Sequence, residues 1–303
     1  MCVEGRVRGR YVWAVTPRPG LPFVFAGAVL LSFAPVFVKL TAVGPTAAGF
    51  YRMALGGLVL AGLVALRRPR FGGDRRALGL AVLAGFLFAA DLILWHQSIH
   101  DVGPGLSTIL ANFQVFILAA VGVLVFGERA GWRLPVAIGL AVVGLFLLVG
   151  GEWADLSPSY RRGIVFGLLT AFAYATYLLV LRNSQGRPIR LDAMANLVII
   201  CAVASAVLAV WAWGAGESLA IPDLRSGLLL LGYGITAQVL AWVLISHGLP
   251  TVDASRAGLV LLAQPALAFV WDVLFFGRPT GLRDLAGASL ALAAIYLGTR
   301  RAV

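Results

Sequence analysis

PGLSTILANFQVFILAAVGVLVF, residues 104–126, continues for 23 residues without a charged side chain. A bilayer hydrocarbon core about 30 Å thick is crossed by about 20 apolar residues in an α-helix, so this stretch predicts a transmembrane helix. Asn112 and Gln114 lie near its middle. Polar side chains at that depth usually face a neighbouring helix or a cavity, because hydrocarbon offers them no hydrogen bonds.

The rest of the chain has the same character, since 60% of the 303 residues are hydrophobic and only 12% are charged. These values are typical of membrane proteins rather than water-soluble domains. The fold class predicted is therefore an all-α integral membrane protein with ten transmembrane helices. The predicted spans are 21–42, 46–66, 77–99, 104–126, 134–150, 163–181, 191–213, 226–247, 254–276 and 282–299.

The formal charge of +11 comes from arginines in the short loops between the apolar runs. With the N-terminus inside, 16 arginines fall on the cytoplasmic side and five on the other, so both termini are predicted to be cytoplasmic, including a tail of residues 1–20. This distribution argues against nucleic acid as a partner. Cys2 and Cys201 form no disulfide framework and no metal-ligand pattern, so no metal and no cofactor are expected.

A shift of 150 residues aligns Val123-Leu124-Val125-Phe126-Gly127 with Val273-Leu274-Phe275-Phe276-Gly277. The same shift superimposes Gln114 on Gln264. The chain is therefore predicted to consist of two repeats, 21–150 and 151–303, with five spans each. Five is odd, so the second repeat crosses the membrane in the opposite direction. Such inverted repeats are typical of alternating-access transporters.

Lys39 ends the first span, Arg52 lies early in the second, and Phe126-Gly127-Glu128-Arg129 closes the fourth. With ten spans arranged as five plus five, this pattern resembles the drug/metabolite transporter superfamily in its ten-helix EamA-type branch. The resemblance implies a bacterial inner-membrane exporter of amino acids or related metabolites, with spans 5 and 10 at the periphery of a central cavity. Arg278-Pro279 departs from the pattern, so no role of Glu128 transfers to it.

Charged groups inside a bilayer cost about 2.5 to 3.5 kcal/mol on insertion scales and usually have a partner or a function. Arg52 and Asp91 fall at the same predicted depth, which predicts an ion pair between them. Trp95 lies one helical turn from Asp91, and Lys39 and His96 lie nearer the same surface. These groups are either a structural pair that locks spans 2 and 3 or part of a substrate or proton pathway.

A second group of candidates lies near the membrane midplane. Gln114, Gln264 and Asn112 are predicted to meet there, where they either bind a polar solute or join neighbouring helices. The aromatic residues Tyr174, Tyr177 and Trp242 either stack on the substrate or pack between helices. Asp272, near the outer end of its span, is expected to be solvated.

Three alternatives stay open. Ala137 and Ala141 in span 5, with Gly287 and Ala291 in span 10, are spaced as small-xxx-small pairs that serve either packing within the monomer or a homodimer. The protein could instead be a channel or a membrane scaffold. His96 and Asp101 match the His-x4-Asp spacing of membrane acyltransferases, although the absence of other catalytic motifs favours a protein that is not an enzyme.

Overall fold

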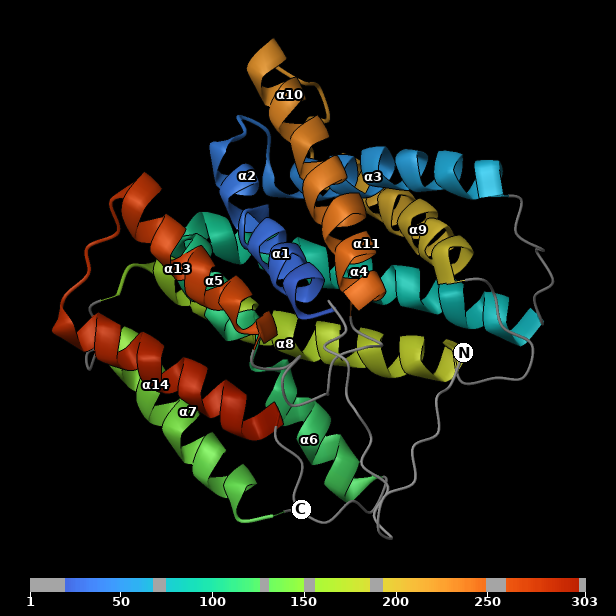
Figure 1. The fold of residues 1–303 in the computed structure, drawn as a ribbon. Coiled ribbons are helices and arrows are strands. Elements are labelled where there is room, and N and C mark those ends of the chain that lie inside the picture. Colours follow the sequence, from blue (N-terminus) through green and yellow to red (C-terminus); the bar gives the residue numbers. More distant parts are fainter. Residues whose placement is uncertain are drawn as a thin grey trace, which may run out of the picture.

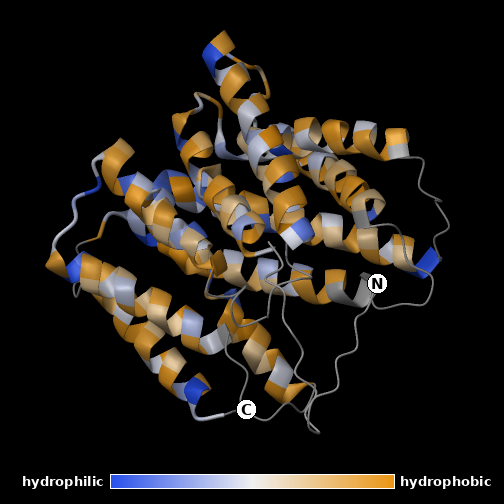
Figure 2. Cartoon of the chain, in the orientation of Figure 1, coloured by the Kyte–Doolittle hydropathy of each residue, from blue (hydrophilic) through white to orange (hydrophobic). Residues whose placement is uncertain are grey.

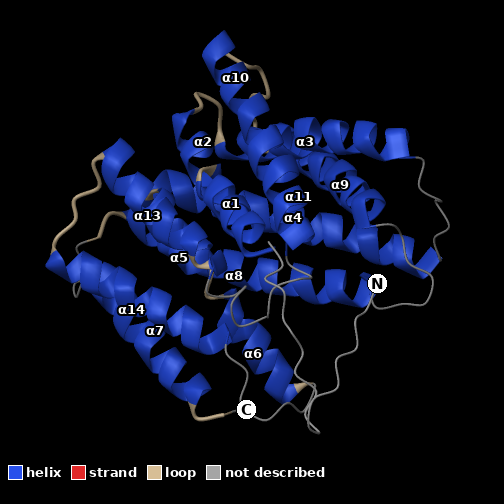
Figure 3. Ribbon diagram, in the orientation of Figure 1, coloured by secondary structure: helices blue, strands red, loops and turns tan. Residues whose placement is uncertain are grey.

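The computed structural model describes residues 20–67, 75–125, 131–149, 156–185, 193–248 and 260–299. Within these ranges every regular element is a helix and no strand occurs (Figure 3). The predicted tail up to residue 19 and the Phe126-Gly127-Glu128-Arg129 motif lie outside the described residues.

Each predicted span corresponds to one helix or to consecutive helices (Figure 1). The first half contains α1 (Gly20–Ser32), α2 (Ala34–Leu40), α3 (Pro45–Arg67), α4 (Arg75–Val102), α5 (Pro104–Ala111), α6 (Gln114–Leu124) and α7 (Arg133–Val149). The second half contains α8 (Pro158–Gln185), α9 (Ala193–Gly214), α10 (Leu224–Tyr233), a π-helical turn η2 (Gly234–Leu240), α11 (Ala241–Gly248), α13 (Ala263–Phe276) and α14 (Leu282–Thr299).

Seven helical segments of the described chain are long and apolar enough to cross a membrane, and α7 and α13 are apolar but shorter. Hydrophobic residues predominate along the helices (Figure 2), and many large apolar side chains among the described residues are exposed. Leu58, Val142 and Leu274 are exposed by 70%, 61% and 65% of their surface. Contiguous apolar surface of this kind suits lipid rather than water. The chain is therefore an all-α, multi-pass membrane protein.

Particular residues define where some of the helices begin and end. Gly103 has φ 88°, which a residue with a side chain rarely adopts, and Pro104 then starts α5 directly. This turn joins α4 to α5 with no loop between them. At the start of α10 the Asp223 carboxylate accepts the N–H of Ser226 at 2.8 Å, and this hydrogen bond lowers the pKa of Asp223.

Spans 5 and 10, α7 and α14, pack against each other along one side of the bundle (Figure 1). A Cβ added to Gly144 would lie 2.7 Å from the backbone nitrogen of Ala291, so the two backbones touch. Ala137, Ala141 and Ala291 are buried in this contact region. The small residues thus serve packing within one chain. A homodimer through these helices remains a prediction and would have to use their outer faces.

Candidate functional site

A cavity of about 300 Å³ lies inside the bundle. Side chains of nearly every span line it, including Leu31 of α1, Thr170 of α8 and Ile295 of α14. Among the described residues α7 contributes none. Span 5 therefore lies away from the cavity as expected, but α9 of span 7 also contributes no lining residue, and span 10 reaches the cavity through Ile295.

Most of the predicted pathway residues lie on this cavity wall. They are Asp91, Trp95, Asn112, Gln114, Tyr174, Trp242 and Gln264, and Arg52 joins them. His96, Tyr177 and Lys39 do not line it. Tyr177 is buried behind the wall, where its ring stacks on Phe88 with centroids 4.8 Å apart. A direct substrate contact by Tyr177 is therefore not supported, and its position favours packing.

The two glutamines related by the 150-residue shift both stand at helix breaks. The helix of span 4 ends at Ala111, and Gln114 begins α6. In span 9 a turn at Leu262 precedes α13, and Gln264 is the second residue of that helix. At the interruption in span 4 the backbone stays hydrogen-bonded, since the N–H of Phe113 donates to the carbonyl of Leu110 at 3.0 Å and the N–H of Val115 donates to the carbonyl of Asn112 at 3.3 Å. Asn112 is occupied locally, because its Nδ2 donates to the carbonyl of Thr108 at 2.8 Å.

Three buried polar atoms of wall residues have no hydrogen-bond partner within the described part of the chain: the indole Nε1 of Trp95, the indole Nε1 of Trp242 and Oε1 of Gln114. Leaving a buried donor or acceptor unsatisfied costs about 1 to 3 kcal/mol each, so native proteins rarely do so without a reason. These two donors and one acceptor belong to side chains that line the cavity.

The predicted ion pair between Arg52 and Asp91 is wrong in this structure. Nε of Arg52 donates to Oε1 of Gln238 at 3.1 Å, and Nη1 donates to the hydroxyl of Tyr233 at 3.2 Å. No nitrogen of Arg52 lies within 4.0 Å of the Asp91 carboxylate, although both residues line the cavity. The partners of Arg52 come from span 8, which sequence spacing within spans 2 and 3 could not indicate.

Asp91 is 5% exposed, and its carboxylate has no hydrogen bond or ion pair among the described residues. A charged group in this position is costly unless a ligand, a proton or water accompanies it. The cavity wall therefore holds one basic and one acidic side chain, and the two are not in direct contact.

His96 lies behind the cavity wall with no exposed surface. Its Nδ1 is 2.6 Å from the carbonyl of Leu92 and its Nε2 is 2.8 Å from the hydroxyl of Tyr233. Asp101 is bound elsewhere, in a bidentate contact with Arg162 at 2.8 and 2.9 Å. The acyltransferase pairing of His96 with Asp101 is therefore wrong, because each group is engaged by other partners.

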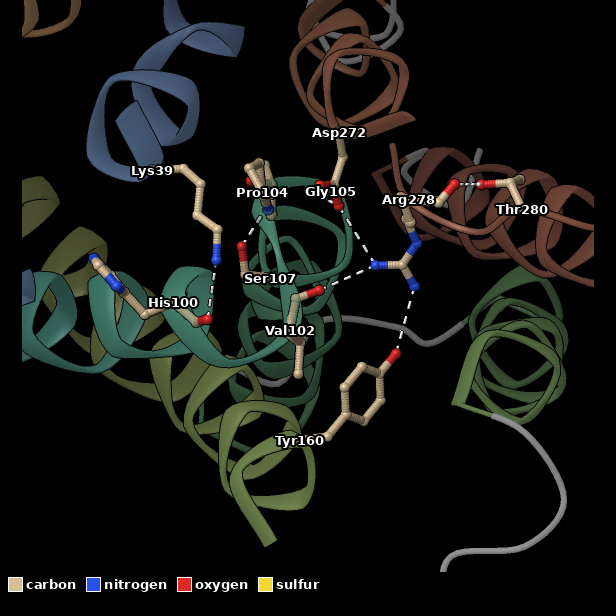
Figure 4. Close-up of polar contacts among 11 residues, drawn as sticks. Lys39, His100, Val102, Pro104, Gly105, Ser107, Tyr160, Asp272, Arg278 and Thr280 are labelled. Atoms are coloured by element: carbon tan, nitrogen blue, oxygen red, sulfur yellow. Dashed lines mark hydrogen bonds and ion pairs between the residues drawn. The ribbon is translucent and has the colours of Figure 1, made fainter. Parts of the chain in front are cut away.

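A second polar cluster joins the end of α13 to the turn between α4 and α5 (Figure 4). We call it the Asp272–Arg278 network. Nη1 of Arg278 donates to the carbonyl of Val102 at 3.0 Å and lies 3.4 Å from the Asp272 carboxylate. That carboxylate accepts the N–H of Gly105 at 3.0 Å, and Nη2 of Arg278 reaches the hydroxyl of Tyr160 at 3.5 Å.

Asp272 is only 3% exposed, so the expectation of a solvated side chain is wrong. The carboxylate is buried because the turn at Gly103 brings the N–H of Gly105 toward α13 and Arg278 folds back over it. The sequence signal was an acid inside an apolar run followed six residues later by an arginine. Lys39 lies at the same end of the bundle, where its Nζ donates to the carbonyl of His100 at 3.2 Å (Figure 4).

A bundle of lipid-facing helices around a cavity with polar and charged walls defines the class of membrane transport proteins. The sequence pattern of the EamA-like transporter family matches residues 18–150 and again residues 161–300. The chain belongs to the EamA-like transporter family, within the drug/metabolite transporter superfamily.

Individual relatives agree with this assignment. An uncharacterized transporter of Archaeoglobus fulgidus is 28% identical, over 95% of this chain and 99% of its own length. A Salmonella typhimurium protein named "Probable amino-acid metabolite efflux pump" is 24% identical over 64% of this chain and 66% of its own length. A crystal structure with 17% sequence identity superimposes with a TM-score of 0.64, covering 92% of this chain and 96% of the other, which indicates a shared fold.

Proposed function

We propose that this protein is a secondary transporter that exports an amino acid or a related zwitterion across a bacterial inner membrane by alternating access. The observation that carries the proposal is the cavity that Arg52 and Asp91 share without pairing. A zwitterion places its carboxylate near Arg52 and its ammonium near Asp91, so both protein charges gain a partner when it binds. The name of the Salmonella relative supports efflux as the direction.

The size and lining of the cavity support a substrate with an apolar side chain. About 300 Å³ accommodates a single amino acid, and Tyr174, Trp242 and Phe88 supply aromatic surface. The unpartnered indole N–H groups add donors for a carboxylate. Gln114 adds an acceptor for an ammonium group.

An inverted repeat is the second part of the proposal. The family pattern matches each half separately. Contacts between helices also follow the 150-residue shift, because α3 packs on α9 and α7 packs on α14, and the shift relates the two helices of each pair to each other. Two further pairs, α4 with α8 and α1 with α11, exchange under the same shift. Together with the breaks before Gln114 and Gln264, these pairings support two related halves around the cavity.

Alternating access requires that one side of the cavity closes while the other opens. The Asp272–Arg278 network and the Lys39 contact lie where α4 ends and α5 and α8 begin. In the predicted topology, with both termini cytoplasmic, this is the outer side. We infer that the conformation described here is closed on that side.

The test uses purified protein and three related compounds. L-phenylalanine carries both charges, phenethylamine carries only the ammonium, and 3-phenylpropionate carries only the carboxylate. The proposal predicts that L-phenylalanine raises the melting temperature more than either analogue, because a ligand that binds only the folded state stabilises it. Equal stabilisation by phenethylamine would contradict a zwitterion site.

A second measurement separates a carrier from a channel. In proteoliposomes loaded with unlabelled L-phenylalanine, a carrier accelerates uptake of labelled L-phenylalanine by exchange. Uptake that is insensitive to the internal amino acid would indicate a channel instead.

A further inference from the structure

Arg52 is held away from Asp91 by a set of buried side chains that do not themselves reach the cavity. We propose that Tyr233, Gln238 and His96 are positioning residues, which keep the Arg52 guanidinium unpaired in the cavity so that the carboxylate of a substrate, rather than Asp91, becomes its anionic partner. This inference rests on the proposed function, because it assumes a substrate with a carboxylate.

The hydrogen bonds to Arg52 leave one edge of its guanidinium free. Gln238 and Tyr233 take up Nε and Nη1, and Nη2 has no hydrogen bond among the described residues. The guanidinium carbon also lies 5.3 Å from the ring centroid of Tyr233 and 5.7 Å from that of Phe88, which are cation–π distances. The group is thus fixed on three sides while Arg52 still lines the cavity.

The π-helical turn explains how one helix supplies both partners. Tyr233 and Gln238 are five residues apart, and in an α-helix of 3.6 residues per turn they would point about 140° apart. The η2 turn closes i to i+5 hydrogen bonds instead, and the N–H of Ala241 bonds to the carbonyl of Thr236. The wider turn brings Tyr233 and Gln238 onto the side that faces Arg52.

His96 in turn orients Tyr233. The carbonyl of Leu92 can only accept a hydrogen bond, so Nδ1 of His96 must carry a hydrogen. In the neutral imidazole Nε2 is then the acceptor. The Tyr233 hydroxyl therefore donates to Nε2 of His96, and its oxygen is left to accept from Nη1 of Arg52. All four side chains are at most 5% exposed, so water does not compete for these bonds.

The hydrogen bonds that Arg52 donates to Tyr233 and Gln238 prevent it from pairing with Asp91 when no substrate is bound. A guanidinium and an ionised carboxylate attract each other strongly in a medium of low dielectric constant, so a free Arg52 side chain would move toward Asp91. With Nε and Nη1 engaged by span 8, the guanidinium stays where it is. A site preorganised in this way binds an incoming carboxylate without first breaking an internal ion pair.

The test removes the positioning bonds and leaves Arg52 in place. In the Tyr233→Phe/Gln238→Leu double variant, the ratio of L-phenylalanine affinity to phenethylamine affinity is expected to fall about tenfold. The released Arg52 pairs with Asp91, so the carboxylate of L-phenylalanine, which phenethylamine lacks, loses its charged hydrogen-bond donor. Cys201→Ala is the matched control, because the sulfur of Cys201 lies 3.5 Å from Nε2 of Gln238 and forms no hydrogen bond with Arg52 among the described residues; the affinity ratio of this variant should be unchanged. A folded double variant that keeps the wild-type ratio would overturn the positioning role. Gln238→Leu alone gives the same test, with a smaller fall, if the double variant does not fold.

A measurement without ligand separates this inference from the proposed function. In the wild-type background Asp91→Asn should maintain or raise the melting temperature, because it removes an unpaired buried charge. In the double variant the freed Arg52 pairs with Asp91, so the same substitution should lower it. An identical effect in both backgrounds refutes the inference, whereas absence of L-phenylalanine binding to the wild type refutes only the zwitterion proposal.

Discussion

Replacing Arg278 with alanine tests whether the Asp272–Arg278 network closes one side of the cavity. The substitution removes the donor to the carbonyl of Val102 at 3.0 Å and the neighbour of Asp272 at 3.4 Å. A hydrogen bond to a charged group contributes about 1.5 to 3 kcal/mol. The 3.0 Å hydrogen bond to Val102 is short enough to contribute this full free energy. The contacts of Arg278 with Asp272 at 3.4 Å and with Tyr160 at 3.5 Å add little to it.

If the closed conformation is destabilised by about 2 kcal/mol, the equilibrium constant between the open and closed conformations rises by about 30-fold. The assay places a reporter at Thr108→Cys, a buried cavity position close to the network, in a Cys2→Ser/Cys201→Ala background. A membrane-impermeant maleimide is applied to intact cells and to inverted vesicles. Arg278→Ala should raise the labelling rate from one side only, by up to about 30-fold.

The control is Arg283→Ala. Arg283 lies five residues further along, where its guanidinium sits 5.8 Å from the ring centroid of Phe146. Its removal should leave labelling unchanged. Equal labelling rates in Arg278→Ala and the parent protein would refute the gating role of the network, and faster labelling from inverted vesicles alone would refute the predicted topology.

Three further predictions concern packing and the cavity. Gly144→Ala should lower the melting temperature, because the added Cβ would lie 2.7 Å from the α14 backbone, at a cost of about 1 to 3 kcal/mol. The control Gly139→Ala should leave the melting temperature unchanged, because a Cβ there would have no neighbour within 4 Å. Asp91→Asn should abolish stabilisation by phenethylamine in thermal-shift assays, and unchanged stabilisation would exclude Asp91 as the ammonium site. Gln114→Leu and Gln264→Leu should weaken L-phenylalanine binding to a similar extent if the repeat is real, and a strongly unequal loss would argue against it.

Much of the fold could be predicted from the sequence because membrane helices are set by local composition. A run of about 20 apolar residues determines a span wherever it lies, since hydrocarbon allows no other backbone arrangement that satisfies its hydrogen bonds. The ends of the spans were less predictable. Asn112 and Gln114 were expected within one continuous helix, but the helix breaks between them.

The candidate site was predicted residue by residue but not contact by contact. A polar side chain in an apolar run is visible in the sequence, and seven such predictions, from Asp91 to Gln264, line the cavity. Burial of Asp272 was missed because it depends on Gly105, which belongs to another span. Tyr233 and Gln238 were missed because their common face depends on a π-helical turn that propensity does not reveal.

The sequence by itself determined that this chain is a membrane protein and where its spans lie. It also determined which ionisable groups lie within those spans. Each of these properties follows from local hydrophobicity and charge. Only the tertiary structure decided which groups meet. Arg52 binds Tyr233 and Gln238 rather than Asp91 because contacts between helices depend on the rotation and register of each helix against its neighbours, and those are set by packing over the whole bundle.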